Sequence, residues 1–432
     1  MLAIHTDGSD DFALALARIA ARGESDHARV EPVVRAILED VAREGDAAVL
    51  RYTQQFDHRT PNPLVLRDFP RAEALAKLPS AARGAMELAA ARIMAFHEHQ
   101  RDPGFRYTVD GVTLGTRVRP LARVGVYAPG GKARYPSSVL MSAIPAHVAG
   151  VRDILLATPL AGDETDEPLF AAAHLAGVTA ILDSGGAQAI AAMAYGTKSV
   201  TRVDKIVGPG NAYVACAKRL VFGAVDIDGI AGPSEILVVA DDEADPRVVA
   251  ADLLSQAEHD ESAYPLLICS SESMAHAVAT EIEQQLQRLP RQAIARASVS
   301  TNGAAFVVST PARAAEVANA IAAEHLSLQV RSPEALLDQI DAAGAAFLGA
   351  LTPEAVGDYV AGPSHVLPTG GTVRFGSPLG VYDFYHRTSI LSYTADALAK
   401  QAEAVTAFAR LEGLEGHARA VEVRFPNEQS RN

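Results

Sequence analysis

The sequence predicts an α/β protein with two parallel-sheet domains, and three observations lead to this class. Short apolar runs alternate with helical patterns over most of the chain, and glycine-rich turns join several of them. The alternation starts again near Ala231–Pro233. A length of 432 residues also exceeds one ordinary domain, so two to three domains are expected.

Residues 1–118 are predicted to form a mainly helical N-terminal region. Between Val30 and Phe56, apolar side chains recur at helical spacing, and Pro32 lies near the start of the pattern. A second helix is predicted over Ser80–His99, with Ser80 as its N-cap. Within that helix, His97 is interpreted as a solvated side chain.

The first α/β domain is predicted over residues 119–233. Its expected strands are Val124–Tyr127, Ile154–Ala157, Ala180–Leu182 and Lys205–Val207. Three of these strands lead into glycine-rich loops, which contain Gly130–Gly131, Gly185–Gly186 and Gly208–Gly210. Parallel sheets bind ligands beyond the carboxyl ends of their strands, so these loops are the first places to search for a site.

The second α/β domain is predicted over residues 234–375, and a small unit over residues 376–432 completes the chain. The expected strands of the second domain are Ile236–Ala240, Leu266–Cys269, Ala305–Val308, Leu326–Gln329 and Ala346–Leu348. Its expected helices are Pro246–Gln256, Glu272–Leu289 and Pro311–Ala323. The C-terminal unit is glycine-rich from about Thr369 and holds a helix at Ala395–Leu411.

Composition and charge exclude some classes of function. The formal net charge of −14 gives an acidic surface that repels phosphate backbones, so no nucleic acid is expected as a partner. No apolar run is long enough to cross a membrane, and the N-terminus lacks the basic region of a signal peptide. Cys216 and Cys269 are interpreted as core residues of a reducing compartment, and a cytoplasmic protein is expected.

The three glycine-rich loops suggest a nucleotide site. Glycine lets the backbone approach a ligand closely, and the helix that follows each loop offers free N–H groups to an anion. None of the loops has the GxGxxG fingerprint. Ordinary strand-to-helix turns explain the pattern equally well, so both interpretations stay open on these residues alone.

A metal site and an acid–base pair are suggested by two Ala-Glu-His triplets that follow predicted helices. Gln256 and His259 are three residues apart, so both can face one ion at a helix end. Glu324 and His325 can serve as acid and base, because histidine titrates near neutrality. Asp358 is a further ligand candidate. The alternative for each histidine is a role as a helix C-terminal residue.

The chain resembles the histidinol dehydrogenase family over nearly its whole length. The matching runs are RGESDHARVEPVVRAILEDVAREGDAAVLRYTQQFD, VGVYAPGGKARYPSSVLMSAIPAHVAGV, VDKIVGPGNAYVACAKR, IAGPSEILVVAD, LLSQAEHD, AEHLSLQ, AGPSHVLPTGGTVRFGSPLGVYDF and EGLEGHARAVEVR. The resemblance implies two Rossmann-like α/β domains, the first for NAD and the second for zinc and catalysis. It also implies oxidation of L-histidinol to L-histidine through L-histidinaldehyde, the last step of histidine biosynthesis, with two NAD and one zinc ion per subunit.

The resemblance also assigns residues to roles. It implies the zinc ligands Gln256, His259, Asp358 and His417 and the catalytic pair Glu324 and His325. It implies substrate contacts from Ser234, Gln256, His259, His325, Asp358, His365, Glu412 and His417. It implies NAD contacts from Tyr127, Gln188 and Asn211. In this family two subunits share their active sites, so Glu412 and His417 are expected to reach the partner of a homodimer.

Two other classes of function compete with this one. A zinc hydrolase would use Glu324 or His325 to activate a metal-bound water, but it has no need for a dinucleotide site. A non-catalytic binding protein with two α/β lobes has no need for the Glu324–His325 pair. NAD binding separates the first alternative from the dehydrogenase, and turnover separates the second.

Overall fold

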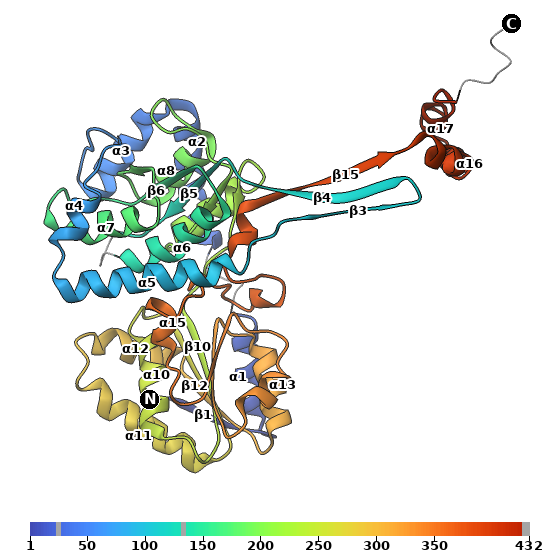
Figure 1. Ribbon diagram of the computed structural model, residues 1–432. Helices are drawn as coiled ribbons and strands as arrows, with labels where there is room; N and C mark the ends of the chain where they lie inside the picture. Colours follow the sequence, from blue (N-terminus) through green and yellow to red (C-terminus); the bar gives the residue numbers. More distant parts are fainter. Residues whose placement is uncertain (23–26, 131–134, 426–432) are drawn as a thin grey trace, which may run out of the picture. The chain divides into compact units, whose positions relative to one another are not determined.

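Three β-sheets are present in the computed structural model, which describes residues 1–22, 27–130 and 135–425 (Figure 1). The chain divides into two units. The first unit is formed by Met1–Arg101 with Leu121–Phe384, and the second unit by Asp102–Pro120 with Tyr385–Asn432. The first unit holds two six-stranded sheets, here named sheet A and sheet B, and the second unit holds a three-stranded sheet.

Sheet B has the strand order β2-β7-β6-β5-β8-β9 and is parallel except for its short edge strand β2, which runs antiparallel to β7. Its strands are β2 (Val65–Leu66), β5 (Arg123–Tyr127), β6 (Asp153–Ala157), β7 (Ala180–Leu182), β8 (Lys205–Val207) and β9 (Asp226–Ile227). The four strands predicted here are confirmed. Helices cover both faces of such a sheet, so its central strands read as apolar runs.

Two groups of helices pack against sheet B. One group shares a buried core with the sheet and consists of α2 (His27–Glu44), α3 (Asp46–Asp57), α8 (Gly186–Tyr195) and α9 (Ala212–Val221). The other group consists of α4 (Ala72–Lys77), α5 (Ser80–Glu98), α6 (Pro136–Ala149) and α7 (Glu167–Leu175). Of these helices, α6 contacts the strands β5 and β6.

Three details of the predicted N-terminal region were wrong. The helical pattern from Val30 to Phe56 is broken by Gly45, which has φ of 60° and precedes α3. Ser80 is the first residue of α5 and not its N-cap, and the N-cap residue, Pro79, makes no side-chain cap bond. His97 is buried, and its Nδ1 pairs with Gln100 Oε1 at 2.8 Å. Burial lowers the pKa of His97, so this imidazole is a core group.

Sheet A has the order β1-β12-β11-β10-β13-β14 and is parallel throughout. Its strands are β1 (Ala3–Thr6), β10 (Glu235–Ala240), β11 (Tyr264–Cys269), β12 (Ala304–Val307), β13 (His325–Gln329) and β14 (Ala345–Leu348). The five strands predicted for this domain are confirmed. The predicted core positions of Cys216 and Cys269 are also confirmed, because both thiols are free and buried.

Helices lie on both faces of sheet A, because successive side chains of each strand point to opposite faces and both rows are apolar. Ile236, Val238 and Ala240 pack with α10 (Pro246–Ala257), α11 (Glu272–Leu286) and α12 (Gln292–Thr301). Leu237 and Val239 pack with α1 (Asp10–Ala20), α13 (Pro311–Ile321) and α14 (Pro333–Leu337). The short helix α15 (Glu354–Tyr359) contacts α10.

The N-terminus belongs to sheet A rather than to a separate helical region. Strand β1 pairs in parallel with β12, with Ala3 opposite Ala304. Helix α1 follows, and its N-cap Ser9 accepts a hydrogen bond from the backbone N–H of Phe12 at 3.2 Å. A run of four residues carries too little periodicity to be distinguished from a loop.

The second unit is built on strands that the sequence analysis did not predict. They are β3 (Phe105–Val109), β4 (Val112–Pro120) and β15 (Tyr385–Tyr393), all antiparallel, and α16 (Ala395–Leu411) and α17 (Glu415–Glu422) follow. The predicted helix Ala395–Leu411 is confirmed at both ends. Every residue of β3 is exposed, so no buried row marks the strand. None of the described helices combines the length and the apolar character that a membrane crossing requires.

Candidate active site

A cavity of about 680 Å³ in the first unit is lined by residues from both α/β lobes. The sheet B lobe contributes the loop Gly208–Asn211, which follows β8. The sheet A lobe contributes Ser234, just before β10, and Glu324, just before β13. The loop that begins at His365 lines the cavity as well. The structure thus brings together four predicted site residues that are separated by long stretches of sequence.

The two sheets border this cavity with opposite ends of their strands. Sheet B contributes the carboxyl end of β8, as expected. Sheet A contributes the amino ends of β10 and β13, whereas parallel sheets usually bind ligands beyond the carboxyl ends of their strands. The carboxyl ends of β10 to β13 line a separate apolar cavity of about 320 Å³, which includes none of the predicted site residues.

Glu324 and His325 form a buried pair with fixed hydrogen-bond partners. One carboxylate oxygen of Glu324, Oε2, accepts from the backbone N–H of Glu235 at 2.9 Å and lies 3.5 Å from His325 Nδ1. His325 Nδ1 lies 2.9 Å from the backbone carbonyl oxygen of Glu235. A carbonyl oxygen only accepts, so Nδ1 carries the proton of the neutral ring. The second ring nitrogen, Nε2, is then free to accept a proton.

Acidic groups surround the free nitrogen of His325. Ligand atoms of His325, Glu354 and Asp358 all lie within 4.8 Å of one another. Glu354 Oε1 lies 3.7 Å from His325 Nε2, and Asp358 Oδ1 lies 3.2 Å from His365 Nδ1. Burial alone would lower the pKa of His325, but the carboxylates of Glu324, Glu354 and Asp358 outweigh it and raise this pKa to about 10. Such an excess of negative charge favours a bound cation. A cation bound among these carboxylates would offset their charge, lower the pKa of His325 again and give the neutral ring that a general base requires.

The predicted zinc ligands of the first unit fit a metal ion. Gln256 is buried on the last turn of α10, and its Oε1 has no hydrogen-bond partner among the described residues. His259 follows α10, is exposed, and lies within electrostatic range of Asp358. An amide oxygen, an imidazole nitrogen and a carboxylate are together a donor set that zinc accepts.

The remaining predicted ligand and one substrate contact lie in the second unit. Glu412 is the C-cap residue of α16 and His417 lies on α17. Both side chains are exposed. Gln256, His259 and Asp358 belong to the first unit, so three of the four predicted zinc ligands lie in one unit and His417 lies in the other.

The predicted NAD contacts lie on the loops of sheet B. The Tyr127 hydroxyl, at the end of β5, accepts from the backbone N–H of Gly186 at 3.1 Å. Gln188 is buried, and its Oε1 has no partner within the described part of the chain. Asn211 caps α9 (Ala212–Val221) by accepting from the N–H groups of its second and third residues, Tyr213 and Val214. Gly131, in the first of the three loops, lies outside the described residues.

One glycine of these loops is sterically required. Gly208 has φ of 113°, and a Cβ atom there would lie 2.1 Å from the backbone oxygen of Tyr127. The loop is also tied down by Asp228, whose Oδ2 accepts from the Gly208 N–H at 2.7 Å, while Lys218 donates to the Gly208 carbonyl oxygen at 2.9 Å. This backbone therefore reaches the cavity in one fixed conformation.

Comparison with known proteins decides the family. The sequence model of the family described as histidinol dehydrogenase matches residues 20–425. The chain belongs to the histidinol dehydrogenase family. A curated histidinol dehydrogenase from Lactiplantibacillus plantarum is 51% identical and covers 92% of this chain and 93% of its own length. Another, from Syntrophotalea carbinolica, is 50% identical and covers 98% of this chain and 99% of its own length.

A solved structure agrees with this assignment. The crystal structure of a histidinol dehydrogenase from Elizabethkingia anophelis has a TM-score of 0.91 and 33% identity, with 98% of each chain covered. The predicted α/β class with Rossmann-like parallel sheets is confirmed by this likeness and by the sheets themselves. Membership of the histidinol dehydrogenase family makes the chain an oxidoreductase.

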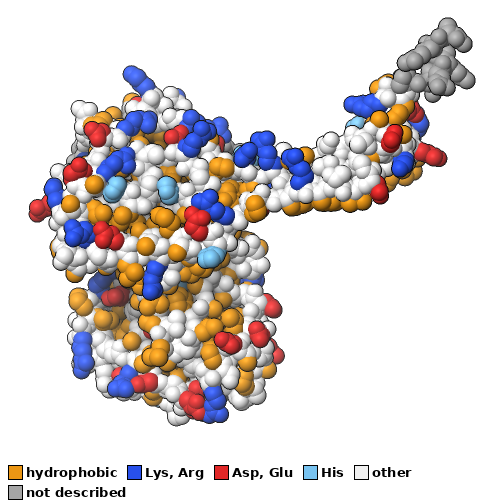
Figure 2. Space-filling view, in the orientation of Figure 1, with side chains coloured by type: hydrophobic (Ala, Val, Ile, Leu, Met, Phe, Trp, Pro, Cys, Tyr) orange, Lys and Arg blue, Asp and Glu red, His pale blue; other side chains and the backbone are white. Residues whose placement is uncertain are grey.

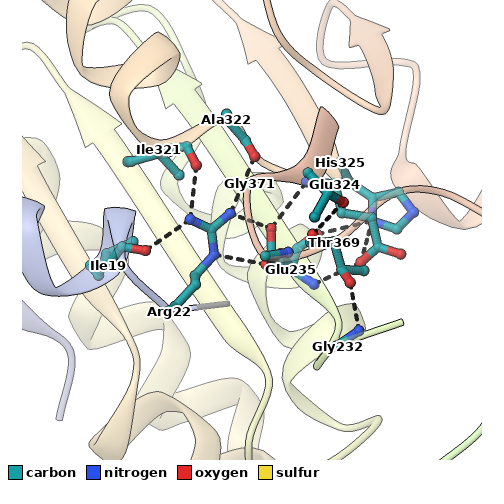
Figure 3. Close-up of polar contacts among 12 residues, drawn as sticks. Ile19, Arg22, Gly232, Glu235, Ile321, Ala322, Glu324, His325, Thr369 and Gly371 are labelled. Atoms are coloured by element: carbon teal, nitrogen blue, oxygen red, sulfur yellow. Dashed lines mark hydrogen bonds and ion pairs between the residues drawn. The ribbon is translucent and has the colours of Figure 1, made fainter. Parts of the chain in front are cut away.

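Three residues next to the candidate active site of this member of the histidinol dehydrogenase family were not predicted from the sequence. Glu235 and Arg22 form a buried ion pair behind Glu324 (Figure 3), and Glu354 faces His325. Glu235 did carry a signal, because it is the one charged residue in the buried apolar strand Glu235–Ala240. Glu354 lies on a helix of six residues and carried none.

Proposed function

We propose that this protein is a zinc-dependent L-histidinol dehydrogenase of the cytoplasm. It oxidises L-histidinol to L-histidine through L-histidinaldehyde in two steps, and each step transfers one hydride to NAD. This is the last step of histidine biosynthesis. The observation that carries the proposal is the buried Glu324–His325 pair, whose Glu324 lines the same cavity as the glycine-rich loop Gly208–Asn211. Family membership supports the choice of substrate.

His325 acts as the general base of the first oxidation. Its Nδ1 proton is held by the Glu235 carbonyl oxygen, so the ring accepts the alcohol proton at Nε2. NAD, when bound, supplies the acceptor for the hydride that leaves the carbinol carbon. The positive charge that develops on the ring is stabilised by the carboxylates of Glu324 and Glu354, at 3.5 and 3.7 Å from its two nitrogens.

Glu324 acts in the second oxidation. Its Oε2 is held by the Glu235 N–H, which orients the carboxylate at the cavity wall. From this position Glu324 takes a proton from the water that adds to the aldehyde carbon, and the hydrate then loses the second hydride. The two steps together consume one water and release the acid.

Gln256, His259 and Asp358, with His417 from the second unit, would hold the zinc ion. Bound zinc supplies an anchor for the imidazole and amine of the substrate, which is an orienting role. His365 pairs with Asp358 and lines the cavity, while Ser234 and Glu412 contact the substrate. The Glu412 carboxylate suits a cationic amino alcohol. Tyr127, Gln188 and Asn211 would contact NAD.

The stoichiometry of NADH tests this reaction. Purified protein loaded with zinc and given L-histidinol with excess NAD is expected to form about two NADH per histidinol, because both oxidations use the same acceptor. A chelator is expected to abolish the activity, and added zinc to restore it. NADH is followed by absorbance, and histidine is counted by mass spectrometry.

Other outcomes would change the proposal in defined ways. One NADH per histidinol, with the aldehyde as product, would remove the second oxidation and the role of Glu324 in it. NADH from another amino alcohol but none from histidinol would change the substrate. No NADH from any alcohol would contradict the dehydrogenase and favour the zinc hydrolase.

A homodimer with shared active sites is part of the proposal. The second unit exposes many large apolar side chains along its strands and helices (Figure 2). Among them are Phe105, Tyr107, Val109, Leu391, Phe408 and Leu411, with exposed fractions from 50% to 82%. Isolated exposed apolar residues are ordinary, but a contiguous row of this kind favours association with another protein surface. A second copy of the chain is the partner that would bring His417 to a zinc site.

Complementation between two inactive variants tests the sharing of sites. In a dimer with crossed sites, His325→Asn paired with His417→Asn leaves one intact site, because both wild-type residues meet in one of the two cavities. Randomly mixed dimers are expected to regain about a quarter of wild-type activity. The measurement is NADH formation after co-expression, with each variant alone as the control. No recovery from verified mixed dimers would mean that His417 serves its own subunit.

A further inference from the structure

A buried ion pair lies behind the catalytic pair in the sheet A lobe (Figure 3). Arg22 follows α1, and Glu235 is the first residue of β10. The Arg22 guanidinium donates to Glu235 Oε1 at 2.7 Å and to Oε2 at 2.5 Å, and the two side chains are 1% and 0% exposed. Its other donors bind the backbone carbonyl oxygens of Ile19, Ile321 and Ala322. The guanidinium is therefore locked by the ends of α1 and α13.

Glu235 contacts Glu324 and His325 with three of its groups. Its side-chain Oε2 accepts from the backbone N–H of Glu324 at 3.2 Å. Its backbone N–H donates to the Glu324 carboxylate at 2.9 Å, and its backbone carbonyl accepts from His325 Nδ1 at 2.9 Å. The position of one residue thus sets the backbone of Glu324, the carboxylate of Glu324 and the ring of His325.

The same carboxylate also binds the loop that lines the cavity from His365 to Thr369. Glu235 Oε1 accepts from the Gly370 N–H at 2.7 Å. Gly370 follows the cavity-lining residues His365 to Thr369, and Thr369 Oγ1 accepts from the Gly232 N–H at 2.6 Å. The carboxylate of Glu235 therefore joins the catalytic pair to the loop that carries His365.

A purely structural role does not account for the pair. Burying two charges costs solvation that their attraction only partly offsets, and apolar residues of similar volume often give equal stability. Neither Arg22 nor Glu235 lines the cavity, so neither contacts a substrate there. What the pair supplies is a rigid set of acceptors for the N–H groups of Glu324 and Gly370.

We propose that Arg22 and Glu235 are positioning residues, which hold Glu324 and His325 in reactive geometry while taking no part in binding zinc or substrate. The inference rests on the proposed function of Glu324 and His325. Displacement of a reacting group by about 1 Å can cost on the order of 100-fold in rate. Removing or displacing the Glu235 carboxylate is therefore expected to lower kcat, while KM for histidinol and the zinc content stay near the wild-type values.

Two variants test the proposal. Glu235→Asp keeps the buried charge pair but withdraws the carboxylate by one methylene from Glu324 and Gly370. The double variant Arg22→Gln and Glu235→Gln removes both charges together, so neither is left unpaired, and it keeps hydrogen-bonding groups. Each is expected to lower kcat about 10- to 100-fold, with KM for histidinol and bound zinc within about twofold. The primary deuterium isotope effect on kcat, measured with histidinol deuterated at the carbinol carbon, is expected to rise.

The control removes a different ion pair from the same lobe. Arg313 and Asp7 pair at 3.0 Å, outside the residues that line the cavity. The double variant Arg313→Gln and Asp7→Asn is expected to keep wild-type kcat and isotope effect.

The outcomes separate this inference from the proposed function. Wild-type protein without NADH formation would reject the proposed function itself. If the wild type is active, and the Glu235 variants fold and keep the wild-type kcat and isotope effect, the positioning role is overturned. The proposed function is then unaffected. If the double variant does not fold, Glu235→Asp decides, because it keeps the charge of the pair.

Discussion

Replacement of His325 by Asn is expected to lower kcat for histidinol oxidation by about 10²- to 10⁴-fold, the usual contribution of a general base. The change removes Nε2, the ring nitrogen that the Glu235 carbonyl leaves free, and it keeps a polar group at the start of β13. This loss equals about 3 to 5 kcal/mol of transition-state stabilisation. Initial rates of NADH formation measure the effect, and zinc content is expected to stay at one per subunit.

His276→Asn is the matched control for this prediction. His276 is exposed on α11 in the same lobe and is expected to be replaceable without loss of activity. Full activity of His325→Asn would show that another group takes the alcohol proton. In that case Glu354, 3.7 Å from the same nitrogen, is the next candidate.

Replacement of His259 by Asn is expected to abolish zinc binding and activity together. The variant loses one of four proposed ligands, and removal of a group that only hydrogen-bonds a ligand already costs about 10- to 100-fold in metal affinity. Atomic absorption after dialysis, with a competing chelator titration, measures the zinc. A His259→Asn protein that keeps one zinc per subunit would contradict the assignment.

The two variants together choose between two sets of ligands. A compact group of metal-binding atoms in the described residues comes from His325, Glu354 and Asp358, and it includes the proposed base. The proposed zinc set shares only Asp358 with that group. Zinc retained by His325→Asn and lost by His259→Asn supports the proposed set, and the reverse pattern supports the compact group.

The sequence predicted the central strands well because both faces of each sheet are covered. Such strands read as unbroken apolar runs, and Ala180–Leu182 and Lys205–Val207 were predicted to the residue. Strand β3 does alternate apolar side chains, with Phe105, Tyr107 and Val109 in one row, but the row is exposed and the sequence analysis did not interpret it as a strand. A turn signal was nevertheless present, since Asp110 and Gly111, with φ of 50° and 79°, form the Asp-Gly hairpin between β3 and β4.

The site residues that could be predicted are those that lie close together in the sequence or match the motifs of the family. Gln256 and His259 lie within four residues, and Glu324 and His325 are neighbours. The partners that orient them were not predictable, because Arg22 and Glu235 are separated by 213 residues and meet only through the packing of α1 on sheet A. The neighbours of each strand in sheet A also became known only from the structure, because strand order does not follow chain order.

The pairing of β1 with β12 delays the folding of sheet A during synthesis on the ribosome. Strand Ala3–Thr6 must wait for Ala304–Val307, and at about 5–20 residues per second this delay is about 15 to 60 s. The sheet B lobe, whose strands fall between residues 65 and 227, is complete long before then. The N-terminus is thus translated first and docked late, and Arg22 reaches Glu235 only when sheet A closes around it.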